Sequence, residues 1–174
     1  YEDENIIVVD KMEGVPTTET VDNLPESLRG QLNDRLRYDR FSAKRLEVAS
    51  RLDACTQGLV VFAKVDKSRD ENTIGKLNKA FRERKVVKKY RLRCRKRPNI
   101  VKGVVSHWQK KTRGSGNAPS VLYSSNDESG SLKRAELEIL SAKESVEIND
   151  ETGEPFWLVE VLLLTGFTHQ IRLQ

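Results

Sequence analysis

The sequence has little of what several classes of protein require. Only two cysteines occur, Cys55 and Cys94, with no CxxC pair, and the only histidines are His107 and His169. We therefore expect no metal site and no disulfide framework, which suits a reducing compartment such as the cytoplasm or the interior of a mitochondrion or plastid. Apolar runs long enough to cross a bilayer are also missing, so we expect a soluble protein with no membrane contact.

The sequence also lacks an initiator methionine and a signal peptide. Because Tyr1 leads almost directly into a predicted strand, we expect a trimmed or processed chain. Its 174 residues are enough for one domain with a hydrophobic core. The 37% hydrophobic and 33% charged residues are typical of a soluble globular protein.

Acidic residues are scarce in one segment only. From Phe81 to Arg113 there are fourteen lysines and arginines against a single acid, Glu83, which gives this segment a net charge of +13. The rest of the chain has 17 basic and 25 acidic residues, a net charge of −8. A solvated surface would explain many charge runs, but this asymmetry indicates a polyanionic partner, with nucleic acid as the first candidate.

The chain is organised around residues 50–64, SRLDACTQGLVVFAK. The first half is a polar turn that holds one carboxylate, Asp53, and ends at Gly58. The second half, residues 59–63, is a continuous apolar run that predicts a buried strand. A carboxylate on such a turn is either a turn cap or a catalytic group, and the pattern alone leaves both interpretations open.

Other elements are predicted from local patterns. Residues 4–11 read as a strand that ends in polar residues, residues 12–17 as a turn, and residues 18–34 as a surface loop or an insertion, because Leu32, Leu36 and Tyr38 make no clear stripe. An apolar stripe of Ile74, Leu77 and Phe81 predicts a helix that ends near Lys85. Its N-cap is predicted at Ser68, Asp70 or Thr73.

Residues 89–95 alternate strictly between two kinds of side chain. Tyr90, Leu92 and Cys94 share one face of a predicted strand, and three arginines share the other. A wholly cationic face suits a phosphate backbone, but charge also protects exposed edge strands from pairing, so both interpretations stay open.

Residues 96–131 are rich in basic and small residues and predict a long, mobile, basic loop that contains His107 and Trp108. Residues 133–140 and 156–164 predict an antiparallel hairpin with a long acidic tip. Near the end of the chain, His169 and Arg172 are spaced by one helical turn. Together these elements predict the α+β class with a mainly antiparallel sheet.

Three stretches together resemble the RluA-type RNA pseudouridine synthases. Residues 50–64 resemble the family signature HRLDxxTSGLLLFAK, residues 81–90 (FRERKVVKKY) resemble FRERxVxKxY, and residues 164–172 (LTGFTHQIR) resemble LxTGRTHQIR. Residues 6–16 are similar to the first strand of the family and its KPxG turn. The motifs occur in family order along almost the whole chain, which makes the match far more specific than one short motif.

The resemblance implies a single catalytic domain over residues 1–174, with a mixed central sheet, truncated at its C-terminus and carrying a basic insertion at about 96–131. It implies isomerisation of uridine to pseudouridine in structured RNA (rRNA or tRNA, within a ribosomal particle or outside one), without cofactor or metal. The catalytic residues would be Asp53, Tyr90 stacked on the target base, and Arg172 as the positive partner of Asp53. We expect RNA contacts from Arg51, Thr56, Lys89, Arg91, Arg93, Arg95, Lys110, Lys111, Arg113 and His169.

Three positions depart from the family pattern. Ser50 replaces a histidine, Gln57 a serine and Phe167 an arginine, all close to the catalytic residues by motif position. A degenerate family member that binds RNA or assists ribosome assembly without chemistry therefore stays open. So does a polyanion-binding module unrelated to RNA, which only the charge asymmetry supports.

Overall fold

The computed structural model describes residues 1–19, 26–38, 44–66, 72–111, 120–123, 132–167 and 169–174. The chain divides into two compact units, Tyr1–Val86 and Val87–Gln174, and each is described by itself. Every strand pairing in these ranges is antiparallel. The α+β class with a mainly antiparallel sheet is thereby confirmed, although the described strands form two sheets where the resemblance implies one.

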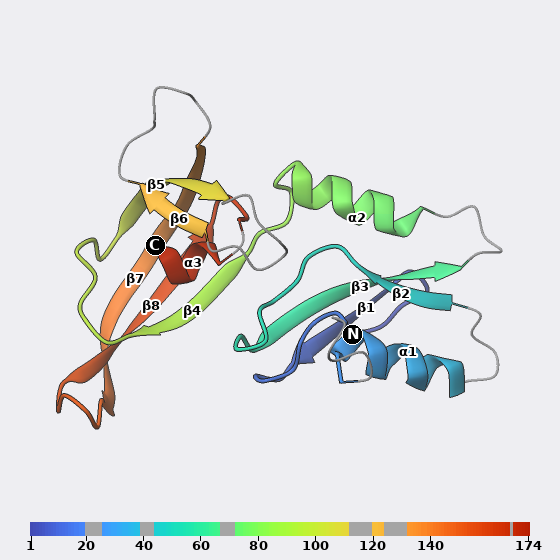
Figure 1. The fold of residues 1–174 in the computed structure, drawn as a ribbon, viewed down its shortest axis with the longest axis horizontal. Helices are drawn as coiled ribbons and strands as arrows, with labels where there is room; N and C mark the ends of the chain where they lie inside the picture. The colour runs from blue at the N-terminus through green and yellow to red at the C-terminus, as the bar shows by residue number, and fades with distance from the viewer. Residues whose placement is uncertain (20–25, 39–43, 67–71, 112–119, 124–131, 168) are drawn as a thin grey trace. The chain divides into compact units, whose positions relative to one another are not determined.

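The first unit is built on a three-stranded sheet with β3 in the middle (Figure 1). Phe62 and Ala63 are adjacent in β3 and both have no exposed surface, so the strand is covered on both faces. Figure 1 shows a helix on either side of this sheet. The elements are β1 (Ile6–Lys11), α1 (Leu28–Tyr38), β2 (Lys44–Val48), β3 (Gly58–Asp66) and α2 (Thr73–Arg82).

Helix α1 corrects the prediction of a loop or insertion over residues 18–34. Leu28, Leu32 and Leu36 are spaced by four residues, so they lie on one helical face, and they pack against the core residues Leu46 and Phe62. The stripe begins at Leu28, which the sequence interpretation did not include. Residues 20–25 lie outside the described part of the chain.

Helix α2 was predicted, but its N-cap was not. The side chain of Asn72 accepts a hydrogen bond of 2.9 Å from the backbone N–H of Gly75, so Asn72 caps the helix rather than Thr73. The other two predicted caps, Ser68 and Asp70, lie outside the described residues. The helix ends at Arg82, close to the predicted end.

The second unit contains a five-stranded sheet in the order β4-β8-β7-β5-β6. Its core is formed by Leu137 and Ile139 on β7 and by Val159 and Val161 on β8, the two strands of the hairpin. The hairpin itself was predicted, but β7 continues further than expected and shortens the tip. The elements are β4 (Lys89–Cys94), β5 (Gly103–Lys111), β6 (Ser120–Tyr123), β7 (Lys133–Ile148), β8 (Pro155–Leu163) and α3 (Gln170–Leu173).

Strands β5 and β6 correct the prediction of one long loop over residues 96–131. His107 and Trp108 lie within β5, paired with Ala135 and Arg134 of β7, rather than in a loop. The composition of this segment is polar and basic, and the ladder of backbone hydrogen bonds to β7 makes it a strand despite that composition. None of the helices in the described ranges is both long enough and apolar enough to span a bilayer.

Candidate functional site

Asp53 lies in the first unit, on the turn that precedes β3. The backbone N–H of Thr56 donates a 3.0 Å hydrogen bond to the Asp53 carbonyl and closes the turn. The Asp53 side chain is half-buried, whereas Ala54 and Cys55 are exposed. The turn joins β3 at Gly58, whose φ of +134° strongly favours glycine, and Leu52 lies against this position. The turn thus places the half-buried Asp53 next to a buried strand.

Both neighbours of Asp53 are held by the segment that follows β1. The hydroxyl of Thr17 donates to the carbonyl of Leu52 at 2.6 Å and accepts from the N–H of Leu52 at 3.2 Å. The carbonyl of Ala54 accepts from the N–H of Gly14 at 2.8 Å. These bonds join segments far apart in the sequence, so the conformation of the turn depends on tertiary structure.

Lys11 adds a third support to the same turn. The sequence interpretation placed this residue at the polar end of a strand, but its side chain has no exposed surface. Its ammonium donates to the carbonyls of Met12 at 2.8 Å, Val15 at 2.7 Å and Ala54 at 3.1 Å. All three donors of the buried ammonium are therefore used. The strand pattern gave no signal for this role, because the acceptors belong to two separate turns.

The charge of Lys11 interacts with the acidic groups around the turn. Burial lowers the pKa of the Lys11 ammonium, and the nearby Cys55, Asp53 and Glu13 counteract part of that effect. A buried ammonium is thus placed close to the predicted catalytic carboxylate within one unit. Lys11 is a functional candidate that the sequence interpretation missed.

Tyr90 and Arg172 both lie in the second unit. Tyr90 is half-buried in β4, opposite Val161, and packs against the core of the unit. Ile171 of α3 packs against the same core, so Tyr90 and the helix that carries Arg172 adjoin one hydrophobic cluster. Arg172 is exposed, and its guanidinium contacts Nδ1 of His169, one helical turn earlier as predicted.

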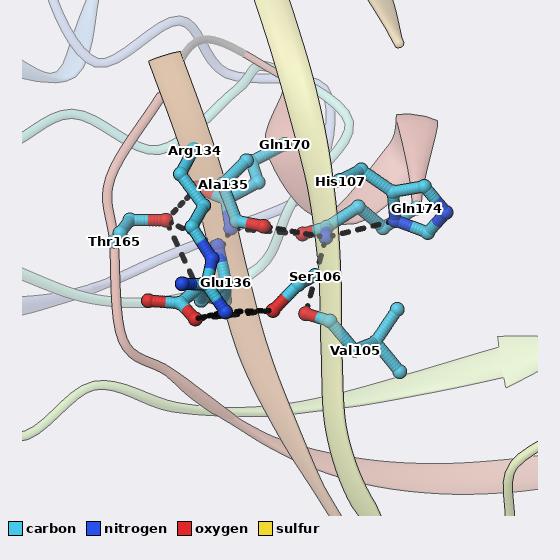
Figure 2. A network of polar contacts seen from close by, with 9 residues as sticks. All are labelled: Val105, Ser106, His107, Arg134, Ala135, Glu136, Thr165, Gln170 and Gln174. Carbon is cyan, nitrogen blue, oxygen red and sulfur yellow. Dashed lines mark hydrogen bonds and ion pairs between the residues drawn. The ribbon is translucent and has the colours of Figure 1, made fainter. Parts of the chain in front are cut away.

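A buried polar network anchors α3 to β7 (Figure 2). The Oε1 atom of Gln170 accepts from the Thr165 hydroxyl at 2.9 Å, and its Nε2 donates to the carbonyl of Glu136 at 3.1 Å. Gln174 continues the network, because its Nε2 lies 3.1 Å from the Ala135 carbonyl and 3.2 Å from Nδ1 of His107. This network fixes the short helix that carries Arg172.

The cationic face consists of Arg91 and Arg93 in β4 and Arg95 directly after the strand, and each of these arginines pairs with a glutamate. Arg91 contacts Glu160 at 2.8 Å, Arg93 contacts Glu147 at 2.5 Å, and Arg95 contacts Glu151 at 2.7 Å. The predicted alternation is confirmed, since these side chains are exposed and the intervening ones face the core. A phosphate that binds this face must compete with the carboxylates of Glu160 in β8, Glu147 in β7 and Glu151 at the hairpin tip.

One of these paired arginines, Arg93, and a further arginine, Arg97, also contact aromatic rings. The guanidinium of Arg93 lies 4.4 Å from the centroid of the Phe156 ring, and that of Arg97 lies 5.4 Å from the Trp157 ring. The hydrogen bond and the Coulomb interaction with Arg91 lower the pKa of Glu160. The cationic face is thus ordered by specific contacts.

The remaining predicted RNA contacts are spread over both units. Arg51 is exposed and Thr56 half-buried in the Asp53 turn, whereas Lys89 is exposed at the start of β4. Lys110 and Lys111 belong to β5, and Arg113 lies outside the described residues. The structure groups Asp53 with Lys11, Thr17, Arg51 and Thr56 in one unit, and Tyr90 with Arg172, His169 and the β4 arginines in the other.

Over the described ranges, no three or more His, Cys, Asp or Glu side chains are grouped so that they could hold a metal ion.

The chain was compared with known protein families and with individual proteins of similar sequence. Residues 5–174 match the family described as RNA pseudouridylate synthase. A ribosomal large subunit pseudouridine synthase C of Rickettsia bellii is 30% identical over 175 residues, and its counterpart in Rickettsia felis is 29% identical over 173. An uncharacterised RNA pseudouridine synthase of Mycoplasma genitalium is 26% identical over 181 residues. Each alignment covers 99% of this chain, which spans about half the length of these curated relatives (50%).

Solved structures agree with this result. Two human proteins, RNA pseudouridylate synthase domain containing 4 and RNA pseudouridylate synthase domain containing 1, each superpose with a TM-score of 0.67 and 25% identity. In both cases the match covers 99% of this chain and 61% of the human chain.

Proposed function

Because the chain belongs to the RNA pseudouridylate synthase family, we propose that it forms the catalytic region of an RNA pseudouridine synthase. Such an isomerase breaks the C1′–N1 bond of a uridine, turns the base and joins C1′ to C5. The C5 proton leaves and N1 gains a proton, so substrate and product have the same composition. The observation that carries the proposal is Asp53, a half-buried acidic residue whose neighbours Leu52 and Ala54 are held by residues 11–17.

Asp53 acts in this proposal as the ionised group at C1′. It either attacks C1′ as a nucleophile or stabilises the sugar after the base has left, and both roles need a charged, partly desolvated carboxylate. A carboxylate held in one direction loses little freedom when it reaches the transition state. The fixed turn at Leu52 and Ala54 supports this role.

Tyr90 and Arg172 complete the proposed catalytic set from the second unit. The ring of Tyr90 stacks on the flipped uracil, and Arg172 supplies positive charge to the reacting carboxylate. The target uridine must leave its stack, because its glycosidic bond cannot be reached inside a helix. The anchoring of α3 by Gln170 supports a fixed position for Arg172 within its unit.

Ribosomal RNA is the proposed substrate. The two Rickettsia relatives are named as ribosomal large subunit pseudouridine synthases. The basic character of residues 81–113 suits the phosphates of a structured RNA. Contacts from the β4 arginines position the RNA and do not by themselves specify the uridine.

A second candidate function is RNA binding without chemistry, as in a ribosome assembly factor. The observation in its favour is the substitution of three family residues by Ser50, Gln57 and Phe167. This candidate predicts RNA affinity with no pseudouridine formed, so the same experiment separates the two.

The test compares Asp53→Asn with the wild-type full-length protein on an RNA identified by transcriptome-wide pseudouridine mapping. Asp53→Asn keeps the shape of the side chain but removes its charge, so we expect no product with RNA affinity and thermal unfolding near wild type. Asp10→Asn is the matched control, because Asp10 is an exposed carboxylate on β1 of the same unit. Product formation by Asp53→Asn at the wild-type rate contradicts the catalytic assignment. No product from any form, with RNA binding retained, supports the second candidate.

A further inference from the structure

The residues on both sides of Asp53, Leu52 and Ala54, are held by one short segment, residues 11–17. Thr17 contacts both backbone groups of Leu52, while Gly14 and Lys11 both donate to the carbonyl of Ala54. The local turn contributes only the bond from Thr56 to the Asp53 carbonyl. Most of the described backbone contacts that orient the turn therefore come from residues about 35 or more positions earlier in the chain.

Thr17 is buried, so its hydroxyl has few hydrogen-bond partners to choose from other than Leu52. The residue is only 3% exposed, so solvent does not compete effectively for its hydrogen bonds. A hydroxyl has one donor and two acceptor sites, and here the donor and one acceptor site are used by the same residue. The contact holds the two peptide groups that flank Leu52, and the second of these leads directly into Asp53.

Lys11 stabilises the rest of the segment of residues 11–17 that holds the Asp53 turn. Its ammonium is fully buried and ties the turn after β1, at Met12 and Val15, to Ala54 of the Asp53 turn. Because a buried ammonium without partners is costly, this arrangement resists local opening. Thr17 thus acts from a segment that is itself held in place.

We propose that Thr17 is a positioning residue for catalysis: its hydroxyl sets the direction in which Asp53 projects. This inference rests on the proposed function of Asp53. Loss of the hydroxyl would release the peptide groups on either side of Leu52, and a displacement of about 1 Å at a reacting group can lower a rate by roughly 100-fold. Binding of the RNA as a whole depends on other residues and would change little.

The experiment uses three variants of the full-length protein. Thr17→Val removes the hydroxyl while it keeps the shape, Thr17→Ser restores the hydroxyl without the methyl group, and Thr18→Val makes the same chemical change one residue further on. Three quantities are measured for each: hydrogen exchange at the Leu52 amide relative to Val61 of β3, kcat, and KM for the mapped RNA. Asp53→Asn is assayed beside them.

For Thr17→Val we expect hydrogen exchange to accelerate, relative to wild type, more at Leu52 than at Val61. We also expect kcat to fall by roughly tenfold or more and KM to stay unchanged. Thr17→Ser should recover most of the turnover, and Thr18→Val should behave like wild type. If Thr17→Val does not fold, Thr17→Cys compared with Thr17→Ser gives the same contrast, since these two side chains differ only in sulfur and oxygen.

The outcomes separate the two proposals. Wild-type kcat in Thr17→Val while Asp53→Asn is inactive overturns the role of Thr17 and leaves the proposed function intact. Equal acceleration of exchange at Leu52 and Val61, without rescue by serine, also overturns it, because Thr17 would then merely stabilise the unit. An active Asp53→Asn overturns the proposed function and the positioning role with it.

Discussion

The side chains of Gln170 and Thr165 form a hydrogen bond of 2.9 Å in the interior of the second unit, where both residues are almost fully buried. The same Gln170 oxygen also accepts from the N–H of Phe167, and its amide nitrogen donates to Glu136 and Gln174. The Gln170 side chain therefore forms hydrogen bonds with the loop before α3, with Gln174 at the end of the helix and with the neighbouring strand β7 (Figure 2).

Replacing Gln170 by methionine should loosen α3. The change keeps the length of the side chain but leaves buried polar groups without their partner, which costs about 1–3 kcal/mol of unfolding free energy. Urea denaturation measures this loss, and hydrogen exchange at Leu173 and Gln174 should rise with it. Ser106→Ala is the control, because Ser106 donates to Glu136 at the exposed edge of the same network. Equal effects of the two variants would contradict the anchoring role.

Neutralising Arg93 and Arg95 together, as Arg93→Gln/Arg95→Gln, should weaken binding to all RNAs about equally. If each guanidinium contacts one phosphate, the dependence of binding on salt should flatten by roughly 0.7 for each lost single-strand contact. A filter-binding series over salt concentration measures the slope.

A matched variant of the paired glutamates should change RNA affinity in the opposite direction. Glu147→Gln/Glu151→Gln removes the carboxylates that contact Arg93 and Arg95 and should tighten RNA binding. A wild-type slope in the arginine variant, together with unchanged affinity in the glutamate variant, would show that the cationic face only protects the strand edge.

Substitution of Tyr90 should affect turnover far more than RNA binding, because its proposed partner is only the flipped base. Tyr90 also packs against the core, so alanine would lower stability as well. Tyr90→Leu keeps an apolar group on the core but removes the flat ring, and Tyr90→Phe keeps the ring without the hydroxyl. Single-turnover assays should show a large loss for leucine. Comparable turnover in the leucine variant and wild type would remove Tyr90 from the catalytic set.

The two cysteines should differ in their reaction with iodoacetamide. Cys55 is exposed in the Asp53 turn, whereas Cys94 is half-buried in β4 and burial raises the pKa of its thiol. Only the thiolate reacts, so a raised pKa keeps Cys94 protonated to higher pH, and its alkylation should continue to accelerate above about pH 8.5, the usual pKa of a free thiol. Mass spectrometry over a pH series gives both rates. A faster reaction of Cys94 than Cys55 near pH 8 would contradict the burial seen in β4.

Sequence patterns predicted elements whose contacts repeat locally. The apolar run in β3 and the alternation in β4 each reflect a buried or half-buried face, so both strands were found. Strand β5 was missed because its side chains are mostly polar and its conformation depends on pairing with β7. The leucine stripe of α1 was missed at Leu28, since a weakly amphipathic segment becomes a helix mainly by packing on the core.

The candidate site divides in the same way. Asp53, Tyr90 and Arg172 were identified because they stand within motifs, and their catalytic roles stay predictions. Lys11 and Thr17 were read as strand end and turn, because their partners at Leu52 and Ala54 lie far along the chain. The glutamates that pair with the β4 arginines were missed for the same reason.

The pairing of β4 with β8 has a consequence for synthesis of the chain on the ribosome. Arg91 and its partner Glu160 are 69 residues apart, so β4 emerges long before the strand that completes it. At about 5–20 residues per second, β4 waits for several seconds without its neighbour. A row of arginines discourages an unpaired strand from joining another nascent chain. The charges of β4 should therefore guard the newly made polypeptide against aggregation before any RNA is met.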